Sequence, residues 1–173
     1  MIIVLLGYMG SGKSSVGKIL AKKLDYNLID LDDYIEEKEN LSVKEIFKTK
    51  GEIYFRKKET EYLNGLLKLK ENTVLALGGG TPCFAGNMEA IVAATNATSI
   101  YLNGSLPFLS KKLFKKKAKR PLIAHIETEA LMLEFIGKHL FERSYFYNKA
   151  ELKIVTDNKK KDEIVEEIIL KLF

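Results

Sequence analysis

Residues 7–14, GYMGSGKS, are the first in the chain whose types and spacing predict chemistry. They fit the pattern G-x-x-x-x-G-K-[ST] and stand between a β-branched run and a helical pattern. Backbone N–H groups of such a loop turn toward phosphate oxygens, the lysine adds a cation, and the serine hydroxyl binds Mg²⁺. We therefore expect ATP and Mg²⁺ as cofactors, and a plain glycine turn is the alternative. The predicted nucleotide-binding residues of this loop are Gly7, Gly10, Ser11, Gly12, Lys13, Ser14 and Ser15.

The rest of the chain separates the classes of phosphate-loop protein. A GTPase reads guanine through N-K-x-D, but the nearest match, residues 158–161, is NKKK and has lysine in place of the carboxylate. A motor or large ATPase would end a hydrophobic strand in Asp or Glu, whereas VLAL at 74–77 runs into three glycines. The sequence therefore favours ATP over GTP, and the acid beside the metal must come from another segment.

Three acids, Asp30, Asp32 and Asp33, follow an apolar run. Ligands of an open parallel sheet bind at the carboxyl ends of the strands, so we expect this cluster at the binding edge. If the strand end stays extended, Asp30 and Asp32 share a face and Asp33 points elsewhere. Phosphoryl transfer to a hydroxyl needs a carboxylate base and an acid near the metal, and this cluster can supply both. Capping of the following helix is the alternative for Asp32 and Asp33.

A triple glycine and a few arginines are the other residues with a predicted role. Gly78, Gly79 and Gly80 end another strand pattern, where they let backbone amides approach a ligand unless they form only a loose turn. Only three of the 28 basic residues are arginines, so each is expected where a planar, bidentate fork matters. A surface ion pair is the alternative for any one of them. The three are Arg56, Arg120 and Arg143.

Alternating strand and helix patterns must position these residues. The expected strands are 2–6, 26–31, 73–77, 98–102 and 152–155. The expected helices are 13–24, 33–38, 43–47, 52–68 and about 162–170. This alternation predicts an α/β fold in which helices cover both faces of a parallel sheet. The 173 residues suffice for one such domain and are short for two.

Composition narrows the environment and the partners. The net charge of +5 favours anionic partners, and the basic run KKLFKKKAKRP at 111–121 is typical of a solvated, mobile segment. Cys83, the one cysteine, excludes an internal disulfide, and we interpret it as a packing residue. We expect His125 and His139 to be structural or surface residues. No apolar run suffices for a signal core or a membrane span, so we expect a cytoplasmic protein with no membrane partner.

Six motifs, in order, resemble those of the shikimate kinases, which are relatives of the nucleoside monophosphate kinases. They are GYMGSGKSSVGKILAKKL, LIDLDDYIE, GEIYFRKKE, LALGGGTP, KRPL and FERSYFYNKA, and they run nearly from end to end. The resemblance implies a P-loop three-layer sandwich with a central, mostly five-stranded parallel sheet. It also implies ATP-dependent phosphorylation of the 3-hydroxyl of shikimate, a step toward chorismate and the aromatic amino acids.

The resemblance further implies how one monomeric domain over 1–173 is divided. Its core comprises residues 1–31, 61–108 and 123–173, a substrate-binding helical insert lies at 32–60, and a lid lies at 109–122. The basic run falls in this lid, which would be mobile when empty and drawn shut by phosphate charge.

Individual roles are implied in the same way. Asp32 would hold two ring hydroxyls and act as the catalytic base, while Asp30 would bind on the metal side with Ser14. Arg56 and Arg143 would clamp the shikimate carboxylate, because two guanidinium forks suit one carboxylate.

Other implied roles concern the backbone and the transferred group. Gly78, Gly79 and Gly80 would contact the substrate through backbone amides. Lys13 and Arg120 would be catalytic, neutralising charge on the transferred phosphoryl group, and Arg120 would also bind the nucleotide.

Two other functions compete with this interpretation. Another small-metabolite kinase of the same fold, such as a gluconate kinase, would share the phosphate loop and lid but need not place Arg56 and Arg143 around a carboxylate. A nucleic-acid-binding module would use Lys111–Arg120 and need neither the aspartates nor the triple glycine. Shikimate kinases usually carry arginine where this chain has Lys111 and Lys112, so no adenine contact is assigned. We therefore expect shikimate and ATP as the small-molecule partners, without nucleic acid.

Overall fold

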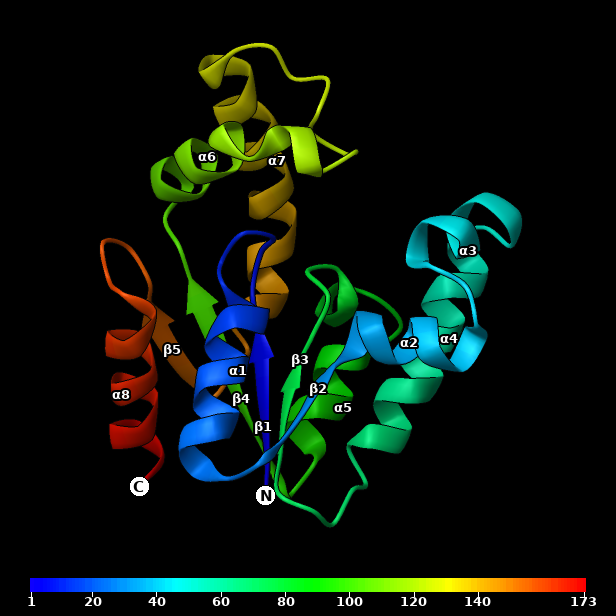
Figure 1. The fold of residues 1–173 in the computed structure, drawn as a ribbon, viewed down its shortest axis with the longest axis vertical. Helices are drawn as coiled ribbons and strands as arrows, with labels where there is room; N and C mark the ends of the chain where they lie inside the picture. Colours follow the sequence, from blue (N-terminus) through cyan, green and yellow to red (C-terminus); the bar gives the residue numbers. More distant parts are fainter.

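The computed structural model describes residues 1–173, and its five strands form one parallel sheet in the order β2-β3-β1-β4-β5 (Figure 1). The strands are β1 (Ile2–Leu6), β2 (Asn27–Asp30), β3 (Thr73–Ala76), β4 (Ala97–Asn103) and β5 (Leu152–Val155). β1 is central and pairs with β3 on one side and β4 on the other. The predicted parallel sheet is confirmed, and every strand lies within one residue of its predicted bounds.

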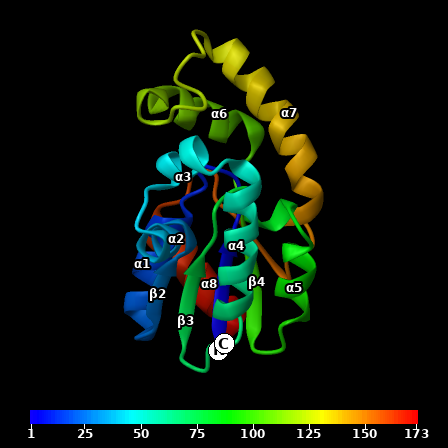
Figure 2. The same ribbon diagram turned by 90° about the vertical axis from the view of Figure 1, so that its right-hand side faces the viewer.

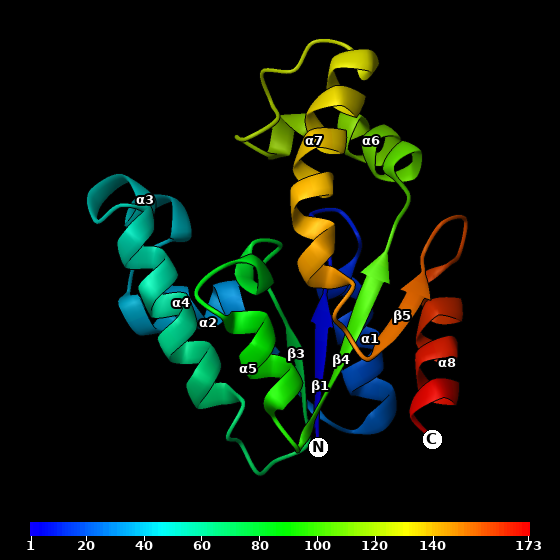
Figure 3. The ribbon, with the colours of Figure 1, turned by 180° about the vertical axis from the view of Figure 1, so that it is seen from behind.

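Helices cover both faces of the sheet, which explains why β1 reads as an unbroken apolar run, IIVLL. Ile3 and Leu5 point toward α1 (Lys13–Leu24) and α8 (Lys161–Leu172). The alternate residues of β1 belong to a second, larger core on the opposite face. That face is covered by α4 (Glu52–Leu66), α5 (Asn87–Ala93) and the lower part of α7 (Glu129–Tyr147), as Figure 3 shows from behind.

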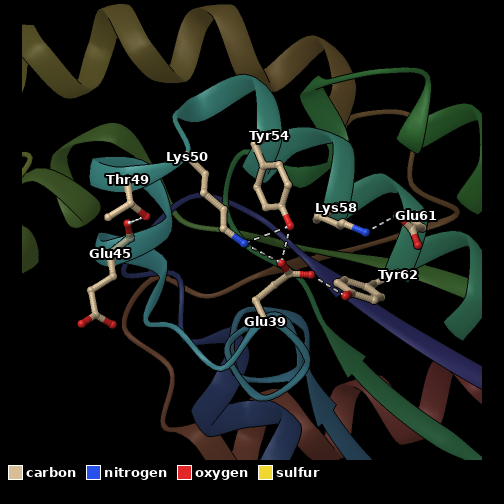
Figure 4. A network of polar contacts seen from close by, with 8 residues as sticks. All are labelled: Glu39, Glu45, Thr49, Lys50, Tyr54, Lys58, Glu61 and Tyr62. Atoms are coloured by element: carbon tan, nitrogen blue, oxygen red, sulfur yellow. Dashed lines mark hydrogen bonds and ion pairs between the residues drawn. The ribbon is translucent and has the colours of Figure 1, made fainter.

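Three helices between β2 and β3 form a unit that we call the insert, residues 31–66. They are α2 (Leu31–Glu39), α3 (Val43–Thr49) and α4. At the end of α2, Glu39 accepts hydrogen bonds from Tyr54 (2.5 Å) and Tyr62 (2.6 Å) of α4 (Figure 4). Lys50 lies 3.6 Å from the same carboxylate, whose side chain is only 7% exposed. This network fixes α2 against α4.

The lid, residues 109–122, is more regular than the sequence predicts. Helix α6 (Leu106–Lys115) begins before the lid and is followed by a short 3-10 turn, η2 (Lys117–Lys119). Leu109 and Leu113 are buried, because one side of α6 packs on the upper half of α7, above the carboxyl ends of the strands (Figure 2). The dense lysines mask these two buried leucines, which explains why the sequence predicts no helix at α6.

Helix α7 is the longest helix and was not predicted. Its apolar residues lie on every side rather than in one stripe, with Met132 and Ile136 buried and Leu133 and Phe141 exposed. No helix of the chain, α7 included, is long and apolar enough to cross a membrane. α7 nevertheless has a clear structural role, because it connects the lid to the site at the sheet edge.

Candidate functional site

The phosphate loop connects β1 to α1 and holds the side chain of Lys13 inside it. Gly10 and Gly12 have φ angles of 78° and 95°, in the left-handed region that favours glycine. Lys13 Nζ donates to the carbonyl oxygens of Gly7 at 2.7 Å and Tyr8 at 2.9 Å. Burial lowers the pKa of Lys13 to about 8, so an anion beside the ammonium would be stabilised and would raise that pKa again.

Two further features of the loop fit a phosphate group. The Ser11 hydroxyl is buried without a hydrogen-bond partner, which is rare for a buried polar atom. Helix α1 begins at Lys13 with no side-chain cap, so its first N–H groups keep their partial positive charge. Both features leave hydrogen-bond donors free where the loop motif predicts phosphate oxygens.

Asp30 connects the phosphate loop to the insert. Its carboxylate accepts from the Ser14 hydroxyl at 2.6 Å through one oxygen and from the Asp32 N–H at 3.1 Å through the other. The second bond caps α2, which begins at Leu31. The prediction that Asp30 and Asp32 share a face of an extended strand is therefore wrong, and so is capping by Asp32 or Asp33: both lie in the first turn of α2.

Asp32 has the electrostatic setting of a proton acceptor. Burial, together with the nearby carboxylates of Asp30 and Glu59, raises the pKa of Asp32 to about 6 against the opposing pull of Lys13 and Arg56. A general base is most effective when its pKa lies near the working pH. Asp32 therefore stays mostly ionised at neutral pH and still accepts a proton readily.

The triple glycine that follows β3 gives three side chains room to approach. A Cβ on Gly78 would lie 3.1 Å from Asp32 Oδ1, and one on Gly79 would lie 3.4 Å from a terminal nitrogen of Arg143. A Cβ on Gly80 would lie 2.9 Å from both terminal nitrogens of Arg56, a separation that real Cβ atoms do not show. The glycines thus bring one acid and two arginines together, a role in addition to the predicted backbone contacts.

Acids of α4 hold Arg56 in place. Its guanidinium donates to Glu59 at 3.0 Å, and its Nε lies 3.6 Å from Glu52. Glu59 is buried and also accepts from the Thr81 hydroxyl at 2.6 Å, at the start of the short 3-10 turn η1 (Thr81–Cys83). The Arg56 guanidinium carbon lies 4.1 Å from the centre of the Phe84 ring. Arg56 is therefore fixed from three sides, with its terminal nitrogens beside the glycines.

Arg143 approaches the same glycines from α7. It has no carboxylate partner, and its guanidinium carbon lies 5.8 Å from the centre of the Tyr8 ring. One helical turn later, the buried Tyr147 donates its hydroxyl to the Gly79 carbonyl at 2.5 Å. This bond fixes α7 to the glycine loop, so both arginines reach the sheet edge from opposite sides.

A cavity of about 360 Å³ extends from the aspartates to the lid. Its walls contain much of the phosphate loop, Asp30, Asp32 and the first two glycines of the triplet, whereas Gly80, Arg56 and Arg143 lie outside this lining. Four cations line it from the other side: Lys112, Lys116, Arg120 and Lys161. None of the four has an acid within ion-pair distance. A polyphosphate is the kind of ligand that such a lining suits.

The whole chain has relatives of known family. The family model for shikimate kinase matches residues 9–173. The chain belongs to the shikimate kinase family. A shikimate kinase of Flavobacterium johnsoniae is 48% identical over 96% of both chains. The crystal structure of a shikimate kinase from Bacteroides thetaiotaomicron has a TM-score of 0.88 and 34% identity, covering 99% of this chain and 98% of that one. A shikimate kinase from Acinetobacter baumannii, solved in complex with shikimate, has a TM-score of 0.83 and 30% identity, covering 99% and 92%.

Several residues that shape this site have no role in the sequence prediction. Glu59 lies three residues after Arg56, and Tyr147 lies four after Arg143, so helical spacing from each arginine could have indicated both. Lys116 and Lys161 line the cavity but stand in lysine-rich segments, where no sequence signal distinguishes them. Membership of the shikimate kinase family makes the chain a kinase.

Proposed function

We propose that this kinase transfers the γ-phosphoryl group of ATP to the 3-hydroxyl of shikimate. The observation that carries the proposal is the packing of Asp32, Arg143 and Arg56 against three consecutive glycines at the mouth of the phosphate loop. Two guanidinium groups beside one another suit a carboxylate, and the acid between them and Lys13 suits a hydroxyl that must lose its proton. Shikimate carries both groups, and shikimate is the molecule bound in the Acinetobacter baumannii relative.

Asp32 is proposed to orient the acceptor hydroxyl and take its proton. Asp32 lies in the first turn of α2, where its N–H donates to the Asp30 carboxylate, and its side chain lines the cavity beside Gly78. With a pKa of about 6, the group is ionised at neutral pH and accepts a proton as the hydroxyl oxygen attacks phosphorus. Gluconate also carries a carboxylate and hydroxyls, so the spacing between the two arginines and Asp32, which must match a rigid six-membered ring, determines the choice of acceptor.

Lys13 and Arg120 are proposed to stabilise the charge on the phosphoryl group in transfer. Lys13 already lies at the centre of the loop, and Arg120 lines the cavity from the lid. Both cations meet the phosphates from opposite sides, where charge on the equatorial oxygens is spread. The remaining loop residues are proposed to hold the β-phosphate through their N–H groups and hydroxyls: Gly7, Gly10, Ser11, Gly12, Ser14 and Ser15.

Ser14 and Asp30 are proposed to hold Mg²⁺. The residues fit the ion, because they place a hydroxyl and a carboxylate in contact at 2.6 Å beside the phosphate loop. Mg²⁺ bound to ATP usually takes one or two protein oxygens and completes its shell with water and phosphate. When bound, the ion neutralises charge on the phosphates. Asp30 also caps α2, so the same carboxylate fixes the position of Asp32.

The lid is proposed to close over ATP. The lid contains seven basic residues and no acid, so it has no internal partner for its charge, and nucleotide phosphates supply one. The chain is also proposed to act as a monomer in the cytoplasm. A nucleic-acid function is not proposed, because the lid cations line the same cavity as the phosphate loop.

A panel assay tests the proposal. Purified protein receives ATP and Mg²⁺ with shikimate, gluconate, a nucleoside monophosphate or no acceptor, and ADP formation is followed. We expect turnover with shikimate at least about 100-fold above the other acceptors, because the flexible open chain of gluconate does not hold its carboxylate and hydroxyls at the fixed spacing of the shikimate ring. Equal turnover with gluconate, or none with shikimate, would overturn the assignment.

A further inference from the structure

Tyr8 belongs to the phosphate loop, yet its side chain leaves the loop and packs against α7. The hydroxyl lies 2.9 Å from His139 Nδ1, and the two rings meet edge to face with their centres 5.7 Å apart. Tyr8 is 1% exposed and His139 is half-buried, so this hydrogen bond is partly shielded from water. Phe135, one turn before His139, closes the other side of the imidazole, with ring centres 5.7 Å apart.

Arg143 lies one helical turn after His139, and the same Tyr8 ring lies beneath its guanidinium. Tyr8 therefore contacts Lys13, Arg143 and His139, each through a different part of the residue. Its carbonyl accepts from Lys13 Nζ at 2.9 Å, its ring faces the Arg143 guanidinium carbon at 5.8 Å, and its hydroxyl meets His139. The ring thus connects the phosphate loop directly to the helix that carries Arg143.

The two arginines are held in different ways. Arg56 has two glutamates within ion-pair distance, whereas Arg143 has none. A cation over an aromatic face is attracted by the ring quadrupole, and this attraction grows where water is excluded. Because Arg143 lacks an acid partner, its cation–π contact with the Tyr8 ring is what orients the guanidinium from the side of the phosphate loop.

We infer that Tyr8 is a positioning residue for shikimate, and that its hydrogen bond to His139 fixes the ring on which the Arg143 guanidinium rests. The inference builds on the proposed function, since it takes Arg143 to bind the shikimate carboxylate. Tyr8 and His139 act as one unit: the hydroxyl holds the ring, and the ring holds the arginine. His139 is then more than the surface or structural residue that the sequence predicts.

The burial of Tyr8 supports a neutral hydroxyl in this role. Burial raises the pKa of Tyr8 to about 12, against the opposing effect of Arg143, so the phenol stays protonated throughout the working range. Burial also lowers the pKa of His139, and the Arg143 charge lowers it in the same direction. A neutral imidazole adds no positive charge beside the carboxylate site and still forms the hydrogen bond.

The test compares Tyr8→Phe, His139→Phe and the double variant in steady-state kinetics and in shikimate binding by calorimetry. Each single change should raise the KM and Kd for shikimate about threefold to tenfold, the loss expected for one hydrogen bond. The kcat and the KM for ATP should stay within about twofold of wild type, because the Lys13 contact uses the Tyr8 carbonyl and survives. The double variant should lose no more than either single variant, because both remove the same bond.

Three controls separate positioning from folding. Tyr26→Phe removes a tyrosine hydroxyl that meets only Met1 Sδ at 3.8 Å, and it should leave both KM values unchanged. Tyr8→Leu removes the ring face as well and should raise the shikimate KM more than Tyr8→Phe does. A shikimate analogue with a carboxamide in place of the carboxylate should bind wild type and Tyr8→Phe equally. Circular dichroism of each variant checks that it is folded at the assay temperature.

Several results would overturn the inference. They are an unchanged shikimate KM in both single variants, losses that multiply in the double variant, or a loss that falls on ATP. Any of these with normal wild-type turnover of shikimate would leave the proposed function standing. Absence of wild-type turnover would instead contradict the proposed function itself.

Discussion

The insert and the lid face each other across the cavity, and their charges are arranged in opposite ways. Four ion pairs join residues within the insert, and Glu39 fixes α2 to α4 through two tyrosines and a lysine. The lid has seven basic residues, no acid and no ion pair. The insert pairs several of its charges internally, whereas the lid pairs none of its charges within the chain.

This difference predicts that the insert is ordered before any ligand binds, whereas the lid becomes ordered when nucleotide binds. The insert carries Asp32 and Arg56, whose positions are set by contacts within the folded chain. The lid carries Arg120, whose position is proposed to depend on attraction to phosphate. We therefore expect changes in the phosphate region to affect the chemical step most, changes at the arginines to affect shikimate binding, and changes in the brace of the insert to affect stability.

Lys13→Ala is expected to have the largest effect on kcat of all the substitutions, because it changes the phosphate loop itself. The change removes the cation at the centre of the phosphate loop, so kcat should fall at least about 1,000-fold. The cost to the fold should be small, because the ammonium bonds only to loop carbonyls. Turnover and thermal unfolding measured together test this, and substantial remaining activity would contradict the assigned role.

Asp32→Asn tests the carboxylate of the insert that lines the same cavity as the lid cations. The amide keeps the shape of the side chain but cannot take a proton, so kcat should fall about 100- to 1,000-fold while ATP binding is retained. The wild type gives a matching pH profile. Since the raised pKa of Asp32 is about 6, the ionised form is lost as the pH falls through 6, and kcat/KM should drop tenfold per unit below it. A profile flat from pH 7 to 5 would argue against Asp32 as the base.

Arg56→Lys and Arg143→Lys act on shikimate binding alone. Each keeps a positive charge and loses the bidentate fork, which should weaken binding by about 1.5–3 kcal/mol, or about 10- to 150-fold in Kd. The carboxamide analogue should bind the wild type poorly and be far less sensitive to either change. Calorimetry with both ligands measures this, and normal shikimate binding by both lysine variants would remove the carboxylate clamp from the account.

The sequence predicts the parts of this site that local rules determine. The phosphate loop is a contiguous pattern, and Asp30 and Asp32 follow a strand, so both fall at the sheet edge by topology alone. Arginine is rare among the many lysines of this chain, and this rarity predicts special roles for Arg56 and Arg143. No local rule joins Tyr8 to His139, however, because 131 residues separate them and only the fold brings them together.

Three other differences have physical causes. The Asp30 side chain caps α2, and this ends β2 one residue earlier than its apolar run predicts. Helix α7 packs against the lid on one part of its surface and the glycine loop on another, so it lacks the single apolar stripe that predicts a helix. The lysines of α6 mask its two buried leucines in the same way. Each case depends on tertiary contacts and not on the residues nearest in sequence.

Glu39→Gln is expected to have the smallest effect on catalysis and a clear effect on stability. The glutamine loses the charge that strengthens the bonds from Tyr54 and Tyr62, so the free energy of unfolding should fall by about 1–3 kcal/mol. Glu71→Gln changes an exposed glutamate whose side chain makes no hydrogen bond or ion pair, and serves as the control. Urea unfolding of both variants measures the difference, and equal stabilities would mean that Glu39 does not brace the insert.

Hydrogen exchange of the insert and the lid, measured free, with shikimate and with a non-hydrolysable ATP analogue, tests the contrast most directly. The account predicts that the amides of α2 and α4 exchange slowly in the free protein and change little with nucleotide. It predicts that the amides of residues 116–122 exchange fast in the free protein and slow by at least about tenfold when the ATP analogue binds. A lid that exchanges at the same rate with and without nucleotide, or an insert that becomes protected only on ligand binding, would contradict it.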